Sequence, residues 1–237
     1  MFELSELTLG EKEYILNIQE VKNLDIIKNI CKINYFGKKV YFYKVNEESI
    51  EKNDCWVNYT GLTSYRPKLI INNLINKGIL KENMNILDIG CGLSEMGIEI
   101  NRILNDKVFY YGLDINKNLI CINKINFTDN NNYKFIEFDL TNTESYSSLN
   151  DSYDIVFACG AATEFYKIFK YISINIKPKY FVCESHNGRM GDLQNIISHC
   201  ENYKILDKYA FQYTSSNGPK DSNWIGYKRT LIILELK

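Results

Sequence analysis

Two glycines separated by one residue follow a short apolar run that holds a single carboxylate. They are Gly90 and Gly92, in the segment Asn-Ile-Leu-Asp-Ile-Gly-Cys-Gly-Leu-Ser-Glu of residues 85–95. Because glycine has no β-carbon, such a turn lets a ligand lie against the backbone. The amides at the start of a following helix can also receive an anionic group. The stretch predicts a ligand-binding turn, but two glycines alone do not identify the ligand.

Three carboxylates are spaced as a nucleoside site would need them. Asp114 ends the next apolar run, where an acid can accept hydrogen bonds from both ribose hydroxyls. Asp139 follows the run after that and could accept a hydrogen bond from an adenine amino group. Asp88 lies inside the first run, where an unpaired charge would be costly. We therefore expect Asp88 to bond to amides of the turn, to water, or toward a cationic ligand.

The elements that would position these residues alternate along the chain. From about residue 80 onward, short apolar runs are separated by stretches with helical spacing of apolar residues. The expected strands are 86–89, 108–113, 135–138, 154–159 and 180–183, and the first is followed by a helix over about 94–105. Apolar strands separated by helices predict a parallel, doubly wound sheet with both faces covered.

Both ends of the chain depart from this alternation. Residues 203–213 and 230–237 resemble strands with no helix between them, so we expect an antiparallel hairpin at the sheet edge. Before the first strand, a helix with Pro67 in its first turn, capped by Ser64 and stopped by Gly78, would bury Leu69 among others. A second hairpin is expected around Gly37-Lys38. We divide the chain into an N-terminal extension (1–50), for which a hairpin, a lid and a dimer contact are the candidate roles, and a catalytic domain (51–237).

Composition excludes several classes of protein. The chain has 237 residues, 45% of them apolar, and a net charge of −1, which suits one α/β domain. This balance gives no overall field to attract nucleic acid or an anionic membrane. No apolar run approaches a membrane span, and the N-terminus lacks the order of a signal peptide. We expect a cytoplasmic protein without a membrane partner.

The seven cysteines are scattered and form neither a CxxC pair nor a cluster with histidine. This pattern predicts free thiols in a reducing compartment, with neither a disulfide framework nor a metal site. Cys91 and Cys159 fall at ligand-facing strand ends, where a reactive thiol would need a neighbouring cation. None is evident, so we interpret both as small apolar side chains that line the site.

Five segments in order resemble class I S-adenosylmethionine-dependent methyltransferases. The first motif corresponds to residues 86–92, and the second to Gly112-Leu113-Asp114-Ile115. The third corresponds to Phe138-Asp139-Leu140, the fourth to residues 153–157, and the turn before strand five to residues 177–179. The terminal strand hairpin distinguishes that family from other Rossmann-like sheets. The resemblance covers about residues 60–237.

The resemblance implies where the cofactor would lie. The Gly90–Gly92 turn would pass beside the methionine portion, Asp114 would hold the ribose, Ile115 would pack on the adenine, and Asp139 would bond to its amino group. Arg66, just before the fold, could pair with the cofactor's carboxylate, as that region does in some members. The candidate cofactor-binding residues are Arg66, Asp88, Gly90, Cys91, Gly92, Asp114, Ile115, Asp139, Leu140 and Cys159.

A nicotinamide dinucleotide is the obvious competitor. Its fingerprint requires glycine or alanine three residues after the second glycine, where this chain has Glu95, a poor neighbour for a pyrophosphate. Asp88 inside the strand also favours a cationic sulfonium. S-adenosylmethionine is therefore the expected cofactor. The chain departs from the methyltransferase loop at one position, because Ser94 stands where a third glycine is common.

The acceptor is less well defined. After the fourth strand the chain reads Ala-Cys-Gly-Ala-Ala-Thr-Glu (158–164), without the Asn/Asp-Pro-Pro-Tyr/Phe sequence of DNA amino methyltransferases. His186, after the fifth strand, is the best-placed general base because an imidazole titrates near neutrality; a loop histidine bonded to backbone is its alternative. Glu164 and Glu184 are further candidate bases or substrate contacts, and His199 is expected to be structural.

Three hypotheses follow from the sequence. The first is methylation of an oxygen atom in a small polar metabolite or sugar derivative, with no DNA partner. The second keeps the enzyme class but makes tRNA or another RNA the acceptor, which predicts binding that weakens steeply with salt. The third is a non-catalytic cofactor-binding or partner subunit with the same fold, and a homodimer remains an open alternative.

Overall fold

A seven-stranded sheet forms the centre of the molecule. The computed structural model describes residues 5–17, 30–43, 66–149, 152–159, 165–185, 190–212 and 228–237. The strand order is β6-β5-β4-β7-β8-β10-β9. The bounds are β4 (Asn85–Ile89), β5 (Phe109–Asp114), β6 (Tyr133–Glu137), β7 (Ile155–Cys159), β8 (Tyr180–Glu184), β9 (Tyr203–Gln212) and β10 (Lys228–Leu236). Strands β4 to β8 are parallel, and β10 runs antiparallel to both β8 and β9.

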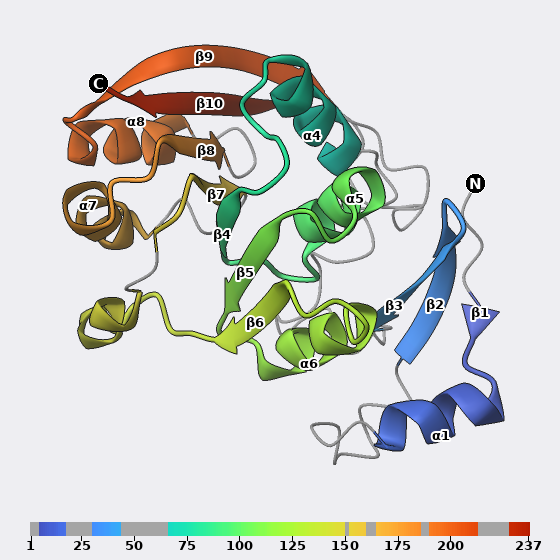
Figure 1. Cartoon of the computed structure of the whole chain (residues 1–237). Coiled ribbons are helices and arrows are strands. Elements are labelled where there is room, and N and C mark those ends of the chain that lie inside the picture. The colour runs from blue at the N-terminus through green and yellow to red at the C-terminus, as the bar shows by residue number, and fades with distance from the viewer. Residues whose placement is uncertain are drawn as a thin grey trace.

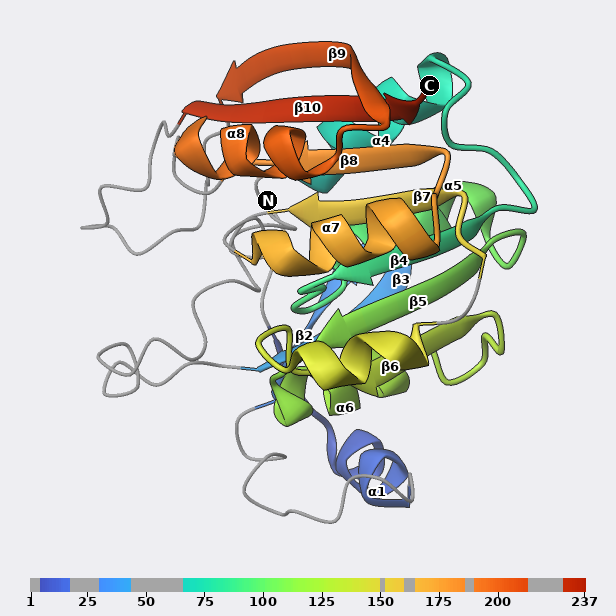
Figure 2. The same cartoon turned by 90° about the vertical axis from the view of Figure 1, so that its left-hand side faces the viewer.

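Helices cover both faces of this sheet (Figure 1). One face carries α4 (Arg66–Asn76), α5 (Glu95–Leu104) and α6 (Lys117–Asn126), and the other carries α7 (Tyr166–Asn175), α8 (Met190–His199) and a 3-10 helix, η2 (Thr143–Ser148). Figure 2 views the α7 and α8 face directly. The doubly wound α/β fold class predicted from sequence is therefore confirmed, including its terminal antiparallel hairpin.

Successive residues of the strands pack into two separate core layers on the two faces of the sheet. In β4, Ile86 packs with the α4–α6 layer, whereas Leu87 and Ile89 pack with the α7–α8 layer. Phe157 and Val156 of β7 divide in the same way. Because both faces of a strand are buried, the strand reads as a continuous apolar run rather than an alternating one. This is why the short apolar runs in the sequence located the strands.

Helix α4 partly follows its predicted pattern. It ends at Asn76, and Gly78 adopts a left-handed φ of 66° and donates its N–H to Ile75 O at 2.9 Å, so glycine stops the helix as expected. The expected burial of Leu69 is wrong: that side chain is 51% exposed, because it lies on the side of α4 away from the sheet. The predicted cap, Ser64, lies outside the described residues.

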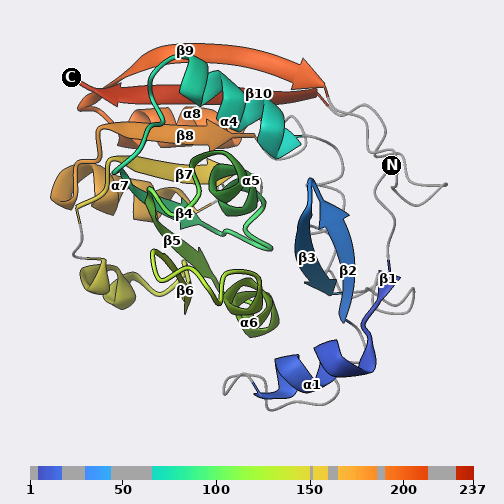
Figure 3. The ribbon, with the colours of Figure 1, turned by 45° about the vertical axis from the view of Figure 1, so that its right-hand side comes forward.

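A second, three-stranded sheet stands beside α5 and α6 (Figure 3). It consists of β1 (Ser5–Glu6), β2 (Ile30–Tyr35) and β3 (Lys38–Tyr43), with α1 (Leu9–Asn17) after β1. The antiparallel pairing of β2 with β3 confirms the hairpin around Gly37. The strand β1 and the helix α1 were not predicted, because β1 is two residues long and α1 has no amphipathic pattern.

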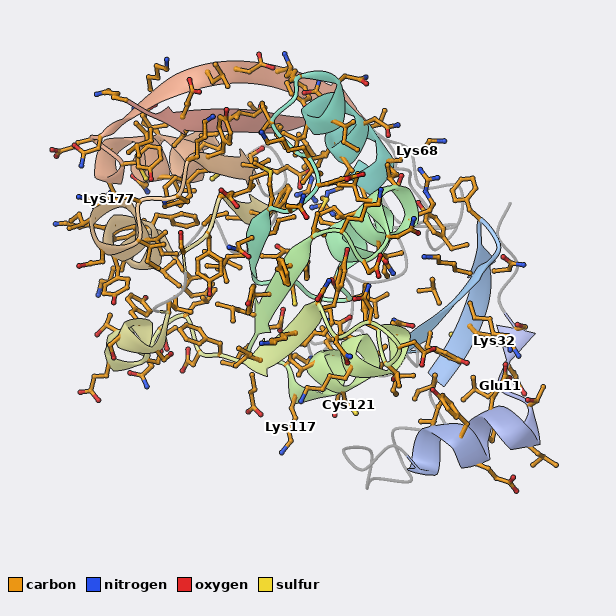
Figure 4. All side chains as sticks on the ribbon, in the orientation of Figure 1. Glu11, Lys32, Lys68, Lys117, Cys121 and Lys177 are labelled. Atoms are coloured by element: carbon orange, nitrogen blue, oxygen red, sulfur yellow. The ribbon has the colours of Figure 1, made fainter. Side chains whose placement is uncertain are left out.

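Several side-chain contacts join this small sheet to the main domain, among them hydrogen bonds of Tyr35 and Tyr41. Tyr35 donates its hydroxyl to Glu99 Oε2 of α5 at 3.0 Å. Asn126 of α6 accepts from Tyr41 N at 2.8 Å and donates to Tyr41 O at 3.1 Å. Within the small sheet, Glu11 and Lys32 point toward each other (Figure 4) and their Oε2 and Nζ atoms are 2.5 Å apart.

The cysteines and helices of the described part of the chain can be stated directly. Among these residues no three or more ligating side chains gather as a metal site would require. Six cysteines are seen, all as free thiols. None of the helices in the described ranges is both long and apolar enough to cross a membrane.

Candidate functional site

The glycine turn connects the end of β4 to the start of α5. Gly90 and Gly92 have left-handed φ angles of 65° and 54°, which most residues with a β-carbon rarely adopt. Between them, Cys91 donates its N–H to Leu113 O of the neighbouring strand at 2.8 Å. The turn therefore folds over the carboxyl ends of β4 and β5, which is where ligands bind in sheets of this kind.

Asp114 holds the turn from the adjacent strand. Its Oδ2 accepts from Gly92 N at 2.8 Å and its Oδ1 from Asn116 N at 2.8 Å. Partial burial raises the pKa of this carboxyl, and the backbone donors oppose that rise. Each oxygen of a carboxylate can accept a second hydrogen bond. The structure thus places Asp114 directly beside the Gly90–Gly92 turn, as a ribose ligand would require.

Two asparagines that the sequence analysis did not identify also support the turn. Asn116 caps α6 by accepting from the amides of Asn118 and Leu119. Asn123, fully buried in α6, donates its Nδ2 to Gly92 O at 2.7 Å. The capping role of Asn116 could have been inferred from an asparagine before a helix. Nothing local marks Asn123, because its partner is 31 residues away.

The expectation for Asp88 needs a correction. Its carboxylate accepts a hydrogen bond from the Tyr110 hydroxyl of β5, a partner that was not considered. Ser94 Oγ in turn donates to that hydroxyl at 3.0 Å. Burial raises the pKa of Asp88 to about 7, and the bond from Tyr110 partly opposes this rise. The hydrogen-bond donor to Asp88 is thus a side chain of the next strand, Tyr110, and not an amide of the turn, water or a ligand as expected.

Arg66, Glu95 and Glu184 form a buried ion cluster beside the turn. Arg66 Nη1 lies 2.6 Å from Glu95 Oε2, and its Nη2 lies 2.5 Å from Glu184 Oε2. Arg66 Nε also donates to both oxygens of Glu184, at 3.0 and 2.8 Å. The sequence predicts Arg66 as a cofactor contact and Glu184 as a candidate base, without pairing them. Both roles stay predictions, and each requires the residue to act from within this ion pair.

The adenine side of the predicted site lies along the ends of β5 and β6. Ile115 is 63% exposed, and so offers an apolar surface to a ring. Asp139 is partly exposed; its Oδ1 accepts from Thr141 N at 2.8 Å and from Thr141 Oγ1 at 2.7 Å, which lowers its pKa. Leu140 follows and is partly buried. These three residues follow the ends of β5 and β6, and their contacts to a cofactor stay predictions.

The two cysteines of the site carry neutral thiols. Burial raises the pKa of both Cys91 and Cys159 well above the usual value. A thiolate nucleophile is therefore not available from either residue near neutral pH. Cys91 has a steric role instead: its Sγ would lie 2.9 Å from a β-carbon built at Gly112, so glycine is needed there.

Several residues predicted for the acceptor side lie outside the described residues. They include His186, Glu164 and Arg189, together with the aromatic residues Trp56, Tyr59 and Tyr65. His199 is described: its Nδ1 lies 2.7 Å from Asn195 O and its ring contacts Tyr166. These contacts at the end of α8 agree with the structural role expected for His199.

Comparison with known proteins identifies the family. Residues 80–225, more than half of the chain, match the model of a methyltransferase domain family. The chain therefore belongs to this methyltransferase family, and it is an enzyme whose cofactor is S-adenosylmethionine. The resemblance, enzyme class and cofactor predicted from sequence are confirmed. No curated protein matches the chain.

Solved structures share the fold at low sequence identity. A putative methyltransferase from Thermoplasma acidophilum has a TM-score of 0.53 at 15% identity, covering 67% of this chain and 70% of its own. TYW2 from M. jannaschii, solved with AdoMet, has a TM-score of 0.55 at 14% identity, covering 88% and 87%. TrmN from Thermus thermophilus has a TM-score of 0.52 at 12% identity, covering 72% and 49%. At these identities the likeness establishes the fold alone.

Proposed function

We propose that this enzyme transfers the methyl group of S-adenosylmethionine to an oxygen atom of a small polar metabolite or sugar derivative. The observation that carries the cofactor part is the Gly90–Gly92 turn bonded to Asp114 at 2.8 Å. A small acceptor is supported by the net charge of −1 and by the sequence Cys-Gly-Ala-Ala at 159–162 in place of the motif of DNA amino methyltransferases.

The residues of the site fit the cofactor. The left-handed glycines leave the turn without β-carbons where the methionine portion would pass, and Asp114 offers acceptor oxygens for the ribose. Asp139 and the exposed Ile115 would receive the adenine. When bound, the cofactor supplies an electrophilic methyl carbon next to a sulfonium. The chain's own contribution is to hold donor and acceptor in line, since alignment alone removes much of the barrier.

Proton removal from the acceptor falls to a side chain near the end of β8. An alcohol oxygen needs a base, and His186 is the proposed one, because imidazole is half-ionised near neutral pH. Glu164 is an alternative base from the segment after β7. Glu184 is less suited to this task than His186, since Arg66 Nε donates to both of its oxygens and occupies them.

Calorimetric titration with S-adenosylmethionine tests the cofactor site. We expect the wild type to bind and Asp114→Ala to bind at least tenfold more weakly, because at least one charge-assisted hydrogen bond worth about 1.5–3 kcal/mol is lost. The matched control is Asp129→Ala, which removes an exposed carboxylate in the loop before β6. Equal affinity of the Asp114 variant and the wild type would refute the assignment.

The base assignment has a separate test. His186→Ala should keep the affinity for S-adenosylmethionine and lower the turnover number by about 10²–10⁴, the usual contribution of general base catalysis. Methyl transfer to a panel of hydroxylated metabolites and sugars is the measurement. A turnover number near the wild-type value would show that His186 is not the base.

One observation favours RNA as a second candidate acceptor. Phe36, at the tip of the β2–β3 hairpin, is 49% exposed and has a left-handed φ of 48°. Lys68 Nζ lies 5.2 Å and Arg102 Cζ 5.0 Å from the centre of its ring. Exposed aromatic rings beside cations are the usual platform for unstacked bases. Lys68 extends from α4 on the side that faces this hairpin (Figure 4).

RNA stays the second candidate because these cations are partly neutralised and not continuous with other basic residues. Arg102 is paired with Glu99 at 2.7 Å and Lys39 with Glu11 at 2.9 Å. A second group of basic residues includes Lys177 and Lys179. Lys177 lies on the side of the molecule opposite to Lys68 (Figure 4). RNA binding predicts that affinity for tRNA falls steeply between 50 and 200 mM salt and drops further in Phe36→Ala. Absent or salt-independent binding would remove this candidate.

A further inference from the structure

The ion cluster of Arg66, Glu95 and Glu184 carries an excess of negative charge in a buried place. One guanidinium faces two carboxylates, and all three residues are at least nine-tenths buried. Asp88, also buried, is close enough for its charge to raise the pKa of Glu95. Buried charges are usually balanced, since an uncompensated one is expensive in a medium of low dielectric. Arg229, also buried, acts on Glu95 as a second cation. Three buried carboxyl groups therefore face two guanidinium groups, so carboxyl groups outnumber cations around Glu95.

One atom of the cluster lacks a donor. Glu95 is 5% exposed, its Oε2 is held by Arg66, and its Oε1 has no hydrogen-bond partner among the described residues. A buried acceptor without a donor costs about 1–3 kcal/mol, and more when it is charged. Burial raises the pKa of Glu95 to about 7; the charges of Glu184 and Asp88 add to this rise, and those of Arg66 and Arg229 oppose it. Glu95 is thus suited to receive a cationic donor.

Glu95 also stands at the right place in the fold. It is the first residue of α5 and follows Gly92 by three positions. Ser94 between them has a left-handed φ of 55° and makes no side-chain bond that caps the helix. The Glu95 carboxylate consequently lies at the helix end of the turn beside which the proposed function places the methionine portion of the cofactor.

We propose that Glu95 binds the ammonium group of the cofactor's methionine portion, with Oε1 accepting its hydrogen bond. Arg66 keeps Oε2 and so fixes the direction of the carboxylate, while Glu184 keeps Arg66 in place. This inference rests on the proposed cofactor site and adds to it a residue for which the family motifs, glycine-rich at this turn, offer no role.

The same helix offers a matched control. Glu99, one turn further along α5, is also fully buried, but both of its oxygens have donors. Its Oε2 accepts from Tyr35 and from Arg102, and its Oε1 accepts from Arg102 at 2.7 Å. Glu99→Gln therefore removes a buried charge from α5 without touching an atom that awaits a ligand.

The experiment measures by calorimetry the affinities of two cofactor relatives that lack the sulfonium. S-adenosylhomocysteine keeps the ammonium group, whereas 5′-methylthioadenosine lacks the whole amino-acid portion. We expect Glu95→Gln to weaken S-adenosylhomocysteine binding at least tenfold and 5′-methylthioadenosine binding less than twofold. Glu99→Gln should leave both affinities within twofold of the wild type.

The outcomes separate this inference from the proposed function. A wild type that binds neither compound refutes the proposed function, whereas wild-type affinity of Glu95→Gln for S-adenosylhomocysteine overturns only the inference. Binding of 5′-methylthioadenosine reports that the variant is folded. If Glu95→Gln binds neither compound, the same two affinities are measured for Glu95→Asp, which keeps the charge but moves it back by one methylene. A larger loss for S-adenosylhomocysteine than for 5′-methylthioadenosine would then support the proposal. An equal loss for both compounds in Glu95→Asp would also overturn the proposal.

Discussion

Asp88 illustrates how a buried carboxyl group can sit inside a central strand. The Tyr110 hydroxyl supplies its hydrogen bond, and Ser94 supplies one to that hydroxyl in turn. Even so, burial dominates, and the pKa values of Asp88 and Glu95 both rise to about 7. Besides Asp114, whose pKa burial also raises, the cofactor-free enzyme therefore carries two carboxyl groups that hold their protons more tightly when the chain is folded.

This arrangement predicts that stability falls as the pH rises. A group whose pKa is higher in the folded state contributes stability that is complete at low pH and is lost on approaching the folded pKa. Between about pH 5 and 7 each of the two groups should lower the free energy of unfolding by up to about 1.4 kcal/mol per pH unit. Urea unfolding of the cofactor-free enzyme at several pH values measures this slope.

Asp88→Asn provides the control for that slope. Asparagine keeps an acceptor for Tyr110 but does not titrate, so the dependence on pH should become clearly weaker, and Glu95 and Asp114 should account for what remains. The charged groups that act on Asp88 are Arg66 and Asp114, and both remain in this variant. Glu11 does not interfere, because its pKa is lowered and its contribution changes only in more acidic solution. An unchanged slope in Asp88→Asn would contradict the assignment.

At the scale of elements, the distance between α5 and β5 is set by a glycine. A β-carbon built at Gly97 would lie 2.4 Å from Ser94 Oγ and 2.9 Å from Tyr110 Cζ. Both neighbours belong to the hydrogen-bonded chain that ends on Asp88. The close approach of helix to strand is therefore a condition for holding that carboxyl group.

Gly97→Ala should consequently destabilise the enzyme. We expect a loss of about 1–3 kcal/mol, the usual cost of forcing extra volume into a packed interior. Gly10→Ala is the matched control: it also lies in a helix, nothing stands within 4 Å of its added β-carbon, and alanine should stabilise it by up to about 1 kcal/mol. Thermal unfolding of both variants measures the difference, and equal melting temperatures would count against this view of the packing.

At the scale of the whole molecule, the small N-terminal sheet is attached to the main domain by a few specific bonds. The pair between Tyr41 and Asn126 joins β3 to α6, and Tyr35 reaches Glu99 on α5. The division into an extension (1–50) and a catalytic domain (51–237) remains our proposal. Glu99 and Asn126 each lie about one helical turn beyond Glu95, which follows the Gly90–Gly92 turn, and Asn123, which bonds to Gly92 O.

Asn126→Ala should loosen the small sheet without affecting the cofactor site. It leaves the Tyr41 backbone groups without partners, at a cost of about 1–3 kcal/mol. We expect faster hydrogen exchange in residues 30–43, unchanged exchange in β4 and β5, and S-adenosylmethionine affinity within twofold of the wild type. Loss of cofactor binding in this variant would mean that the small sheet takes part in forming the site.

The sequence by itself determined the sheet, the turn and the cofactor class. The strands β4, β7 and β8 are buried on both faces and are short apolar runs, so hydropathy could locate them, whereas the edge strand β6 exposes alternate residues. The order Gly90, Gly92, Asp114 and Asp139 is equally local, because each residue lies at the end of its strand or within three positions of it. Such features are visible because a few consecutive residues suffice to specify them.

Only the tertiary structure decided which side chains meet. Tyr110 reaches Asp88 because the register of β4 against β5 brings together residues 22 positions apart. Arg66 pairs with Glu184 across 118 residues, and the same guanidinium fixes Glu95. No local pattern encodes these contacts, since strand order and register create them. The glycine turn could therefore be found from the sequence, whereas the charges that surround it could not.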